Sequence, residues 1–96
     1  MDGLYLKTYQ EEINSSEFRG NKKPDPIEII NFFDLNSAMD GFQELQKRAV
    51  LSGWSVVGRS ELDKEWPERK KYTNSLIKAY FRKENSIMII TLEDIY

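Results

Sequence analysis

The clearest pattern of apolar and polar positions runs from Leu35 to Trp54 and predicts one amphipathic α-helix. Ser37 is a suitable N-cap residue with Asp40 three residues later, and Gly53 is suited to the left-handed conformation that ends many helices. Gly41 costs about 1 kcal/mol relative to Ala inside a helix, so we interpret it as a small residue that permits close packing. Apolar side chains recur at alternating steps of three and four residues, at Leu35, Ala38, Phe42, Leu45 and Ala49.

Patterns with a period of two predict strands on both sides of this helix. Leu4–Tyr9 alternates between apolar and polar-aromatic positions, and Trp54–Leu62 alternates again after the helix. The segment 75–93 predicts a β-hairpin, with Glu84 and Asn85 as its two-residue turn. The polar segments 10–23 and 63–74 are predicted to be loops.

Two alternatives compete for the segment Ile27–Phe33. Asp25 as N-cap, Pro26 at the first helical position and Glu28 three residues after the cap would begin a helix. The segment is short, however, and consists mostly of β-branched and aromatic residues, which favours a strand. We therefore favour the strand and keep the helix as the alternative.

Together these elements predict an α+β fold over residues 1–96 as a single domain. One main helix packs on a mostly antiparallel sheet of four to five strands, in the order β-β-α-β-β-β. The expected core consists of Leu6, Ile29, Ala38, Phe42, Leu45, Ala49, Trp54, Val56, Ile77, Ala79, Phe81, Met88, Ile90 and Leu92.

Composition narrows the functional classes. The chain of 96 residues contains no Cys and no His, which removes the thiol nucleophile, the commonest general base and the commonest metal ligands. Serine is present, but a triad of the usual kind needs His, and the neighbouring carboxylates Glu93 and Asp94 should point to opposite faces of a strand. We therefore expect a protein without catalytic activity, without a cofactor and without a metal site. The lack of Cys favours the cytoplasm, and neither a signal peptide nor a membrane span is expected.

The predicted register of the hairpin suggests a protein-binding surface. Ile87 and Ile89 would lie beside Arg82 and Tyr80, on the face turned away from the helix. If nothing covered them, these side chains would form an exposed apolar strip, which usually marks an interface. A second copy of the chain is the simplest cover, and the segment 10–23 is the alternative cover. The predicted partner-binding residues are Leu76, Lys78, Tyr80, Arg82, Ile87 and Ile89.

The distribution of charge suggests an alternative function. Residues 1–45 carry nine acidic and four basic side chains, whereas residues 64–83 carry seven basic and two acidic ones. Basic side chains with interleaved aromatic rings are typical of surfaces that bind single-stranded nucleic acid. The candidate residues are Lys64, Arg69, Lys70, Lys71 and Tyr72. We therefore expect a small, non-catalytic protein-interaction module that binds a protein partner or a second copy of itself as a homodimer, with nucleic-acid binding as the alternative.

Overall fold

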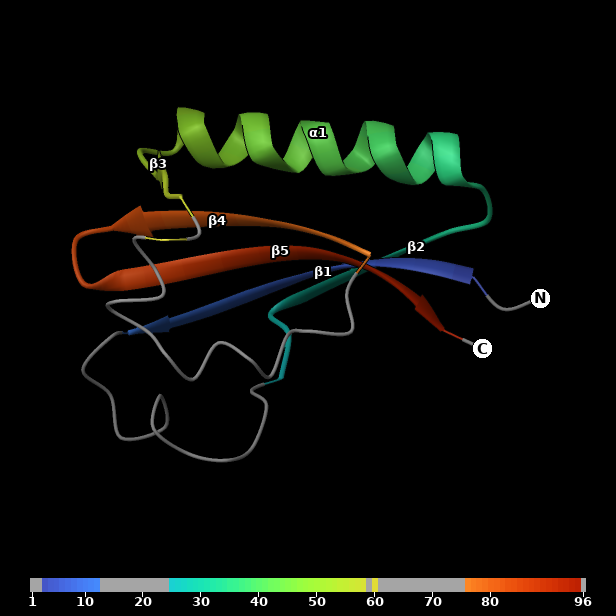
Figure 1. The fold of residues 1–96 in the computed structure, drawn as a ribbon, viewed down its shortest axis with the longest axis horizontal. Helices are drawn as coiled ribbons and strands as arrows, with labels where there is room; N and C mark the ends of the chain where they lie inside the picture. Colours follow the sequence, from blue (N-terminus) through green and yellow to red (C-terminus); the bar gives the residue numbers. More distant parts are fainter. Residues whose placement is uncertain (1–2, 13–24, 59, 61–75, 96) are drawn as a thin grey trace.

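A computed structural model of the protein describes residues 3–12, 25–58, 60 and 76–95. Its elements are β1 (Gly3–Glu12), β2 (Glu28–Phe32), α1 (Leu35–Leu51), β3 (Ser55–Val56), β4 (Ile77–Lys83) and β5 (Ser86–Ile95). The strands form one antiparallel sheet in the order β2-β1-β5-β4-β3, and α1 covers one of its faces (Figure 1). The predicted α+β class and the predicted order of elements are confirmed.

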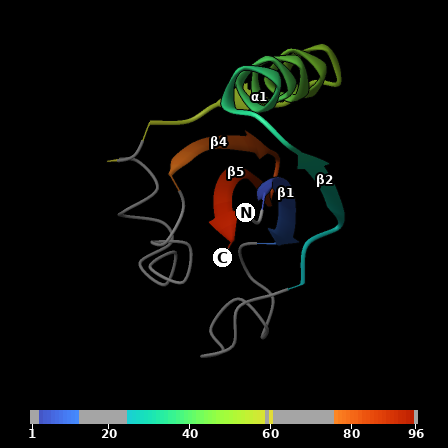
Figure 2. The ribbon, with the colours of Figure 1, turned by 90° about the vertical axis from the view of Figure 1, so that its right-hand side faces the viewer.

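The two longest strands form the middle of the sheet. β1 and β5 have ten residues each and pair along their whole length, from Gly3 opposite Ile95 to Glu12 opposite Ser86. β2 and β3 form the two margins of the sheet. In Figure 2, α1 lies above the sheet and β2 lies at one margin of it.

The ends of α1 have recognisable causes in the sequence. Asp34 is the N-cap residue, because its Oδ1 accepts a hydrogen bond of 2.8 Å from the backbone N–H of Ser37. The prediction of Ser37 as N-cap was therefore wrong: Ser37 lies inside the first turn and donates to the cap. At the other end Gly53 takes a φ of 96°, which confirms its predicted role in ending the helix.

The strands differ from the prediction mainly in length. β2 confirms the strand alternative for the segment after Pro26, and β1 continues three residues beyond the predicted end, to Glu12. The strand predicted over Trp54–Leu62 is present but shorter: β3 comprises only Ser55 and Val56, and residues 59, 61 and 62 lie outside the described residues.

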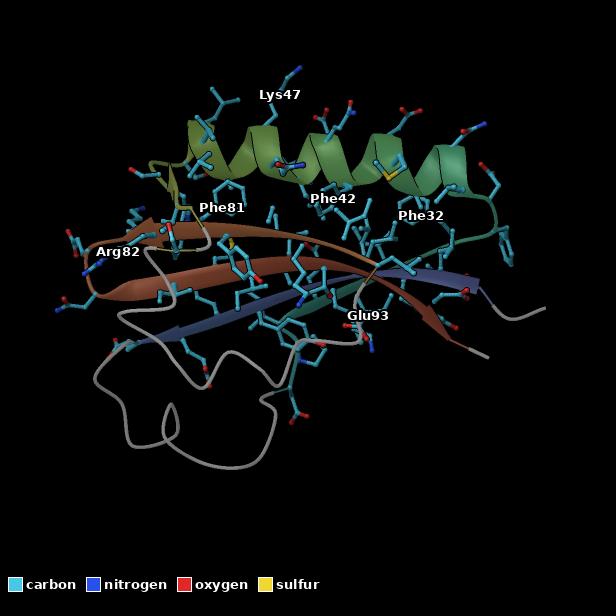
Figure 3. The ribbon with its side chains drawn as sticks, in the orientation of Figure 1. Phe32, Phe42, Lys47, Phe81, Arg82 and Glu93 are labelled. Carbon is cyan, nitrogen blue, oxygen red and sulfur yellow. The ribbon has the colours of Figure 1, made fainter. Side chains whose placement is uncertain are left out.

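The core lies between α1 and the sheet, and most of its predicted members are buried. Phe42 from α1, Phe81 from β4 and Phe32 from β2 all belong to the cluster between the helix and the sheet, while Lys47 points away from the sheet (Figure 3). The buried residues of this cluster are Leu6, Ala38, Phe42, Leu45, Ala49, Phe81, Met88, Ile90 and Leu92, and Trp54, Ile77 and Ala79 pack against it partly buried.

Two predicted core residues are exposed instead. Ile29 is 55% exposed and Val56 is 71% exposed. In β2 it is Ile30 and Phe32 that pack against the core, so the alternation of the strand turns Ile29 to the opposite face. Val56 lies on the edge strand opposite Phe81. The following residue, Val57, is buried, but with Tyr9, Ile87 and Ile89 on the face of the sheet turned away from α1.

The hairpin of β4 and β5 has the predicted register. Lys83 lies opposite Ser86, so Glu84 and Asn85 form the turn between them. Glu84 has a φ of 55°, a conformation that the first central residue of such hairpin turns requires. Arg82 lies opposite Ile87, and Tyr80 lies opposite Ile89, as the sequence predicted.

Candidate protein-binding surfaces

The face of the sheet turned away from α1 contains most of the predicted partner-binding residues. Lys78, Tyr80 and Arg82 follow one another at every second position of β4 and are half-buried. Arg82 donates a hydrogen bond of 3.0 Å from Nε to the carbonyl oxygen of Glu84 in the turn. Leu76 immediately precedes β4 and is 57% exposed.

The two isoleucines of this predicted surface are covered within the chain itself. Ile87 and Ile89 are each only 1% exposed, and Tyr9, Val57 and Tyr80 pack with them in a second apolar cluster. The condition for an exposed strip is therefore not met, and no second copy is needed to cover them. Partner binding through Leu76, Lys78, Tyr80 and Arg82 stays a prediction, but it lacks the apolar centre on which it depended. The alternative cover was the segment 10–23, of which residues 10–12 belong to β1 and residues 13–23 lie outside the described residues.

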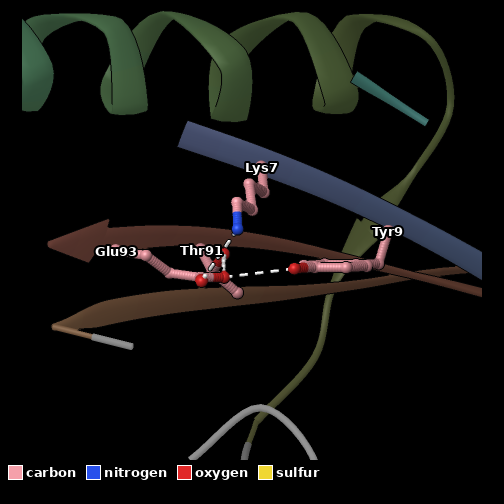
Figure 4. Close-up of polar contacts among 4 residues, drawn as sticks. All are labelled: Lys7, Tyr9, Thr91 and Glu93. Atoms are coloured by element: carbon pink, nitrogen blue, oxygen red, sulfur yellow. Dashed lines mark hydrogen bonds and ion pairs between the residues drawn. The ribbon is translucent and has the colours of Figure 1, made fainter. Parts of the chain in front are cut away.

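A buried polar network lies farther along the same face, between β1 and β5. Lys7 and Tyr9 lie two residues apart on β1, while Thr91 and Glu93 lie two residues apart on β5, so all four side chains share one face. The Glu93 carboxylate accepts hydrogen bonds from Tyr9 Oη (3.1 Å) and Thr91 Oγ1 (2.8 Å), and its Oε1 lies 3.2 Å from Lys7 Nζ (Figure 4). A buried carboxylate needs such partners, because burial of an uncompensated charge is costly.

The chemistry of this network indicates a structural role. Burial, followed by the charge of Glu93 and the hydrogen bond to it, raises the pKa of Tyr9 well above its ordinary value of 10.0. Tyr9 therefore stays protonated and donates a hydrogen bond to Glu93, which fixes both side chains. Glu93 is 9% exposed while Asp94 is exposed, and their register positions place them on opposite faces, as predicted.

The other candidate sites are not placed by the structure. The predicted nucleic-acid residues Lys64, Arg69, Lys70, Lys71 and Tyr72 all lie outside the described ranges. Within the described ranges, no group of three or more Asp or Glu side chains could hold a metal ion. None of the helices in these ranges is long and apolar enough to span a membrane.

The two margins of the sheet differ in a way that the sequence alone did not indicate. β3 is only two residues long, and short edge strands give little backbone for another chain to pair with. β2 has five residues, and the segment 27–33 around it contains one charged residue, Glu28. Ile27 (62%), Ile29 (55%) and Phe33 (80%) are strongly exposed along this margin.

The backbone of β2 faces outward at alternate residues. The N–H of Ile27 donates a hydrogen bond of 2.8 Å to the carbonyl oxygen of Thr8, so the peptide groups of Thr8 are directed toward β2. Glu28 lies opposite Thr8, and successive residues of an antiparallel strand direct their peptide groups to alternate sides. The N–H and C=O groups of Ile29 and Asn31 therefore point away from β1. No strand of the described ranges lies beyond this margin.

A shallow groove lies next to this margin on the helix side. It has a volume of about 210 Å³ and opens between the C-terminal half of α1 and the strands beneath it. Ile27 and Glu28 line it on the β2 side, and Arg48 and the C-cap residue Ser52 contribute polar groups from the helix. The remaining lining residues are Thr8, Leu45, Ala49, Trp54, Met88 and Ile90. The groove makes the start of β2 accessible from the side of the helix.

No protein-family model, curated protein or solved structure matches this chain.

Proposed function

We propose that this protein is a small, non-catalytic interaction module that binds an extended segment of a protein partner along the outer margin of β2. One combination of features carries the proposal. The peptide groups of Ile29 and Asn31 point outward, and the apolar side chains along the same margin are exposed, namely those of Ile27, Ile29 and Phe33. A partner strand that adds to a sheet edge gains affinity from main-chain hydrogen bonds and specificity from alternate side chains.

The contrast between the two margins supports this choice of surface. Proteins usually protect a free edge with charged residues, proline or a very short strand. β3 is protected by its shortness. Pro26 precedes β2 and lies outside the strand, so it does not protect the margin of β2 in this way. The segment after Pro26, Ile-Glu-Ile-Ile-Asn-Phe-Phe, combines high β-propensity with a single charge, a composition that pairs readily with other strands.

The proposal can be tested with a labelled peptide that copies residues 26–34, whose binding is followed by fluorescence anisotropy at low protein concentration. Asn31→Pro removes the outward N–H of β2 while leaving the backbone hydrogen bonds to β1 intact, because Pro is tolerated where the N–H faces away from the sheet. It also removes the Asn31 side chain, whose Nδ2 donates a hydrogen bond of 3.4 Å to the carbonyl oxygen of Leu4 on β1. Asn31→Ala removes the same side chain but keeps the N–H, so it is the matched control.

We expect the parent protein and Asn31→Ala to bind the peptide, and Asn31→Pro to bind it at least about tenfold more weakly, a difference of about 1.4 kcal/mol. A scrambled peptide of the same composition should not bind. Absence of binding to the parent protein, or equal binding by the Pro and Ala variants, would overturn the proposal.

Two further expectations from the sequence remain proposals. A cytoplasmic location rests on the absence of Cys alone. Nucleic-acid binding through residues 64–72 is the alternative function, and retention on DNA-cellulose that salt abolishes would support it.

A further inference from the structure

We infer that the segment that β2 accepts is β2 of a second copy of this chain, related by a two-fold axis at Ile30. This inference rests on the proposed function, and it names the partner. A two-fold axis presents the same surface to itself, so the edge must be compatible with its own antiparallel image. Both the backbone and the side chains of β2 meet that condition.

The backbone condition concerns which peptide groups face outward. With the axis at Ile30, Ile29 of one copy lies opposite Asn31 of the other copy, and the axis repeats this pair. These are the two residues of β2 whose peptide groups point away from β1. Each pair can therefore exchange hydrogen bonds in both directions, as the hydrogen-bonded pairs of an antiparallel ladder do. If the axis lay at Ile29 or Asn31 instead, that residue would lie opposite its own copy. The two hydrogen-bonded pairs between Ile29 and Asn31 would then not form.

The side-chain condition concerns charge and apolar surface. In this register Glu28 lies opposite Phe32 of the second copy, so the single charge of the segment does not face itself. Ile27 and Phe33 lie directly before and after β2, so this register brings Ile27 of one copy beside Phe33 of the other at the ends of the ladder. These are the two most exposed apolar side chains along this margin, at 62% and 80%. Pairing would remove both from water, where each exposed apolar side chain forgoes about 1.5–3 kcal/mol of burial.

The absence of Cys makes this geometry directly testable by disulfide trapping. Residues at the two-fold position form a non-hydrogen-bonded pair, whose Cα atoms lie about 4.5 Å apart, within the range of a disulfide. Ile30→Cys should therefore cross-link to its own copy under mild oxidation. Glu28→Cys is the matched control in the same strand, because its two copies would be offset by four residues, about 13 Å, which is too far. Val56→Cys, exposed on the other margin, controls for random collision.

Sedimentation equilibrium from micromolar to near-millimolar concentration gives the second measurement. We expect the parent protein and Asn31→Ala to form a reversible dimer, Asn31→Pro to be monomeric, and the peptide of residues 26–34 to dissociate the dimer. Ile30→Cys should become almost fully cross-linked, whereas the two control variants should not.

The outcomes separate this inference from the proposed function. A parent protein that stays monomeric but binds the peptide would overturn the two-fold dimer and leave the proposed function standing. A dimer that survives Asn31→Pro, or Ile30→Cys that cross-links no more than Glu28→Cys, would place the contact elsewhere and also overturn the inference. If Asn31→Pro does not fold, cross-linking of Ile30→Cys against its controls still decides the question.

Discussion

A Cβ atom added to Gly41 would lie 2.6 Å from Cζ of Phe32 and 3.1 Å from Cδ1 of Leu6. Gly41 faces the sheet from the middle of α1, and Phe32 is the last residue of β2. The predicted role of Gly41, a small residue for close packing, therefore has a specific partner: the glycine lets the ring of Phe32 pack beneath the helix. This contact links the edge strand to the core and helps to hold β2 in place.

Gly41→Ala should destabilise the protein although Ala is the better helix former. The helix gains about 1 kcal/mol of propensity, but overpacking costs about 1–3 kcal/mol, so we expect a net loss of about 1 kcal/mol in urea denaturation. The double variant Gly41→Ala/Phe32→Leu should lose less free energy of unfolding than the two single variants lose together, because the smaller Leu side chain leaves room for the added methyl group. A gain in stability in Gly41→Ala would mean that the ring moves without cost.

The stability contributed by Tyr9 should depend on pH in the alkaline range. Burial and Glu93 raise the pKa of Tyr9 above its ordinary value of 10.0, so above that pH the unfolded chain loses a proton that the folded chain keeps. This contribution is fully present below pH 10 and is lost as the pH rises above it. Tyr9→Phe removes the titrating group, so its free energy of unfolding should fall less steeply than that of the parent between pH 9 and pH 11. Equal slopes would show that Tyr9 is not held protonated.

Glu84 in the hairpin turn offers a test of backbone strain. Its φ of 55° disfavours residues with a Cβ, and its side chain is exposed, so little contact is lost on substitution. Glu84→Gly should raise the free energy of unfolding by up to about 1 kcal/mol, whereas β-branched Glu84→Val should lower it by about 1 kcal/mol. Thermal unfolding of both variants decides it, and the opposite order would contradict this turn geometry.

The sequence predicted the elements whose patterns are local and strong. The buried face of α1 and the register of the hairpin were predictable, because a period of three to four residues and a two-residue turn each depend only on residues that are close together in the sequence. The N-cap was misassigned because Asp34 and Ser37 are both good capping residues, and only the geometry shows which of them accepts the hydrogen bond.

The remaining errors concern contacts between distant segments. Ile29 and Ile30 are both apolar, so the pattern of β2 cannot show which of them faces the helix. The cover of Ile87 and Ile89 includes Tyr9, about eighty residues away in the chain. The open margin of β2 depends on the order of strands in the sheet, which no local pattern encodes. The apolar segment 27–33 can be recognised in the sequence, but its position at the edge of the sheet cannot.

The exchange rate of the Asn31 amide proton, measured by NMR on the monomeric protein, below the concentration at which it dimerises, with and without the peptide of residues 26–34, tests the central claim most directly. If the peptide pairs with β2, this outward N–H becomes hydrogen-bonded, and its exchange should slow about 100-fold when the peptide is present at 100 times its dissociation constant. The amide of Ile30, which faces β1, should change much less. An Asn31 amide that exchanges at the same rate with the peptide bound would contradict binding at this edge.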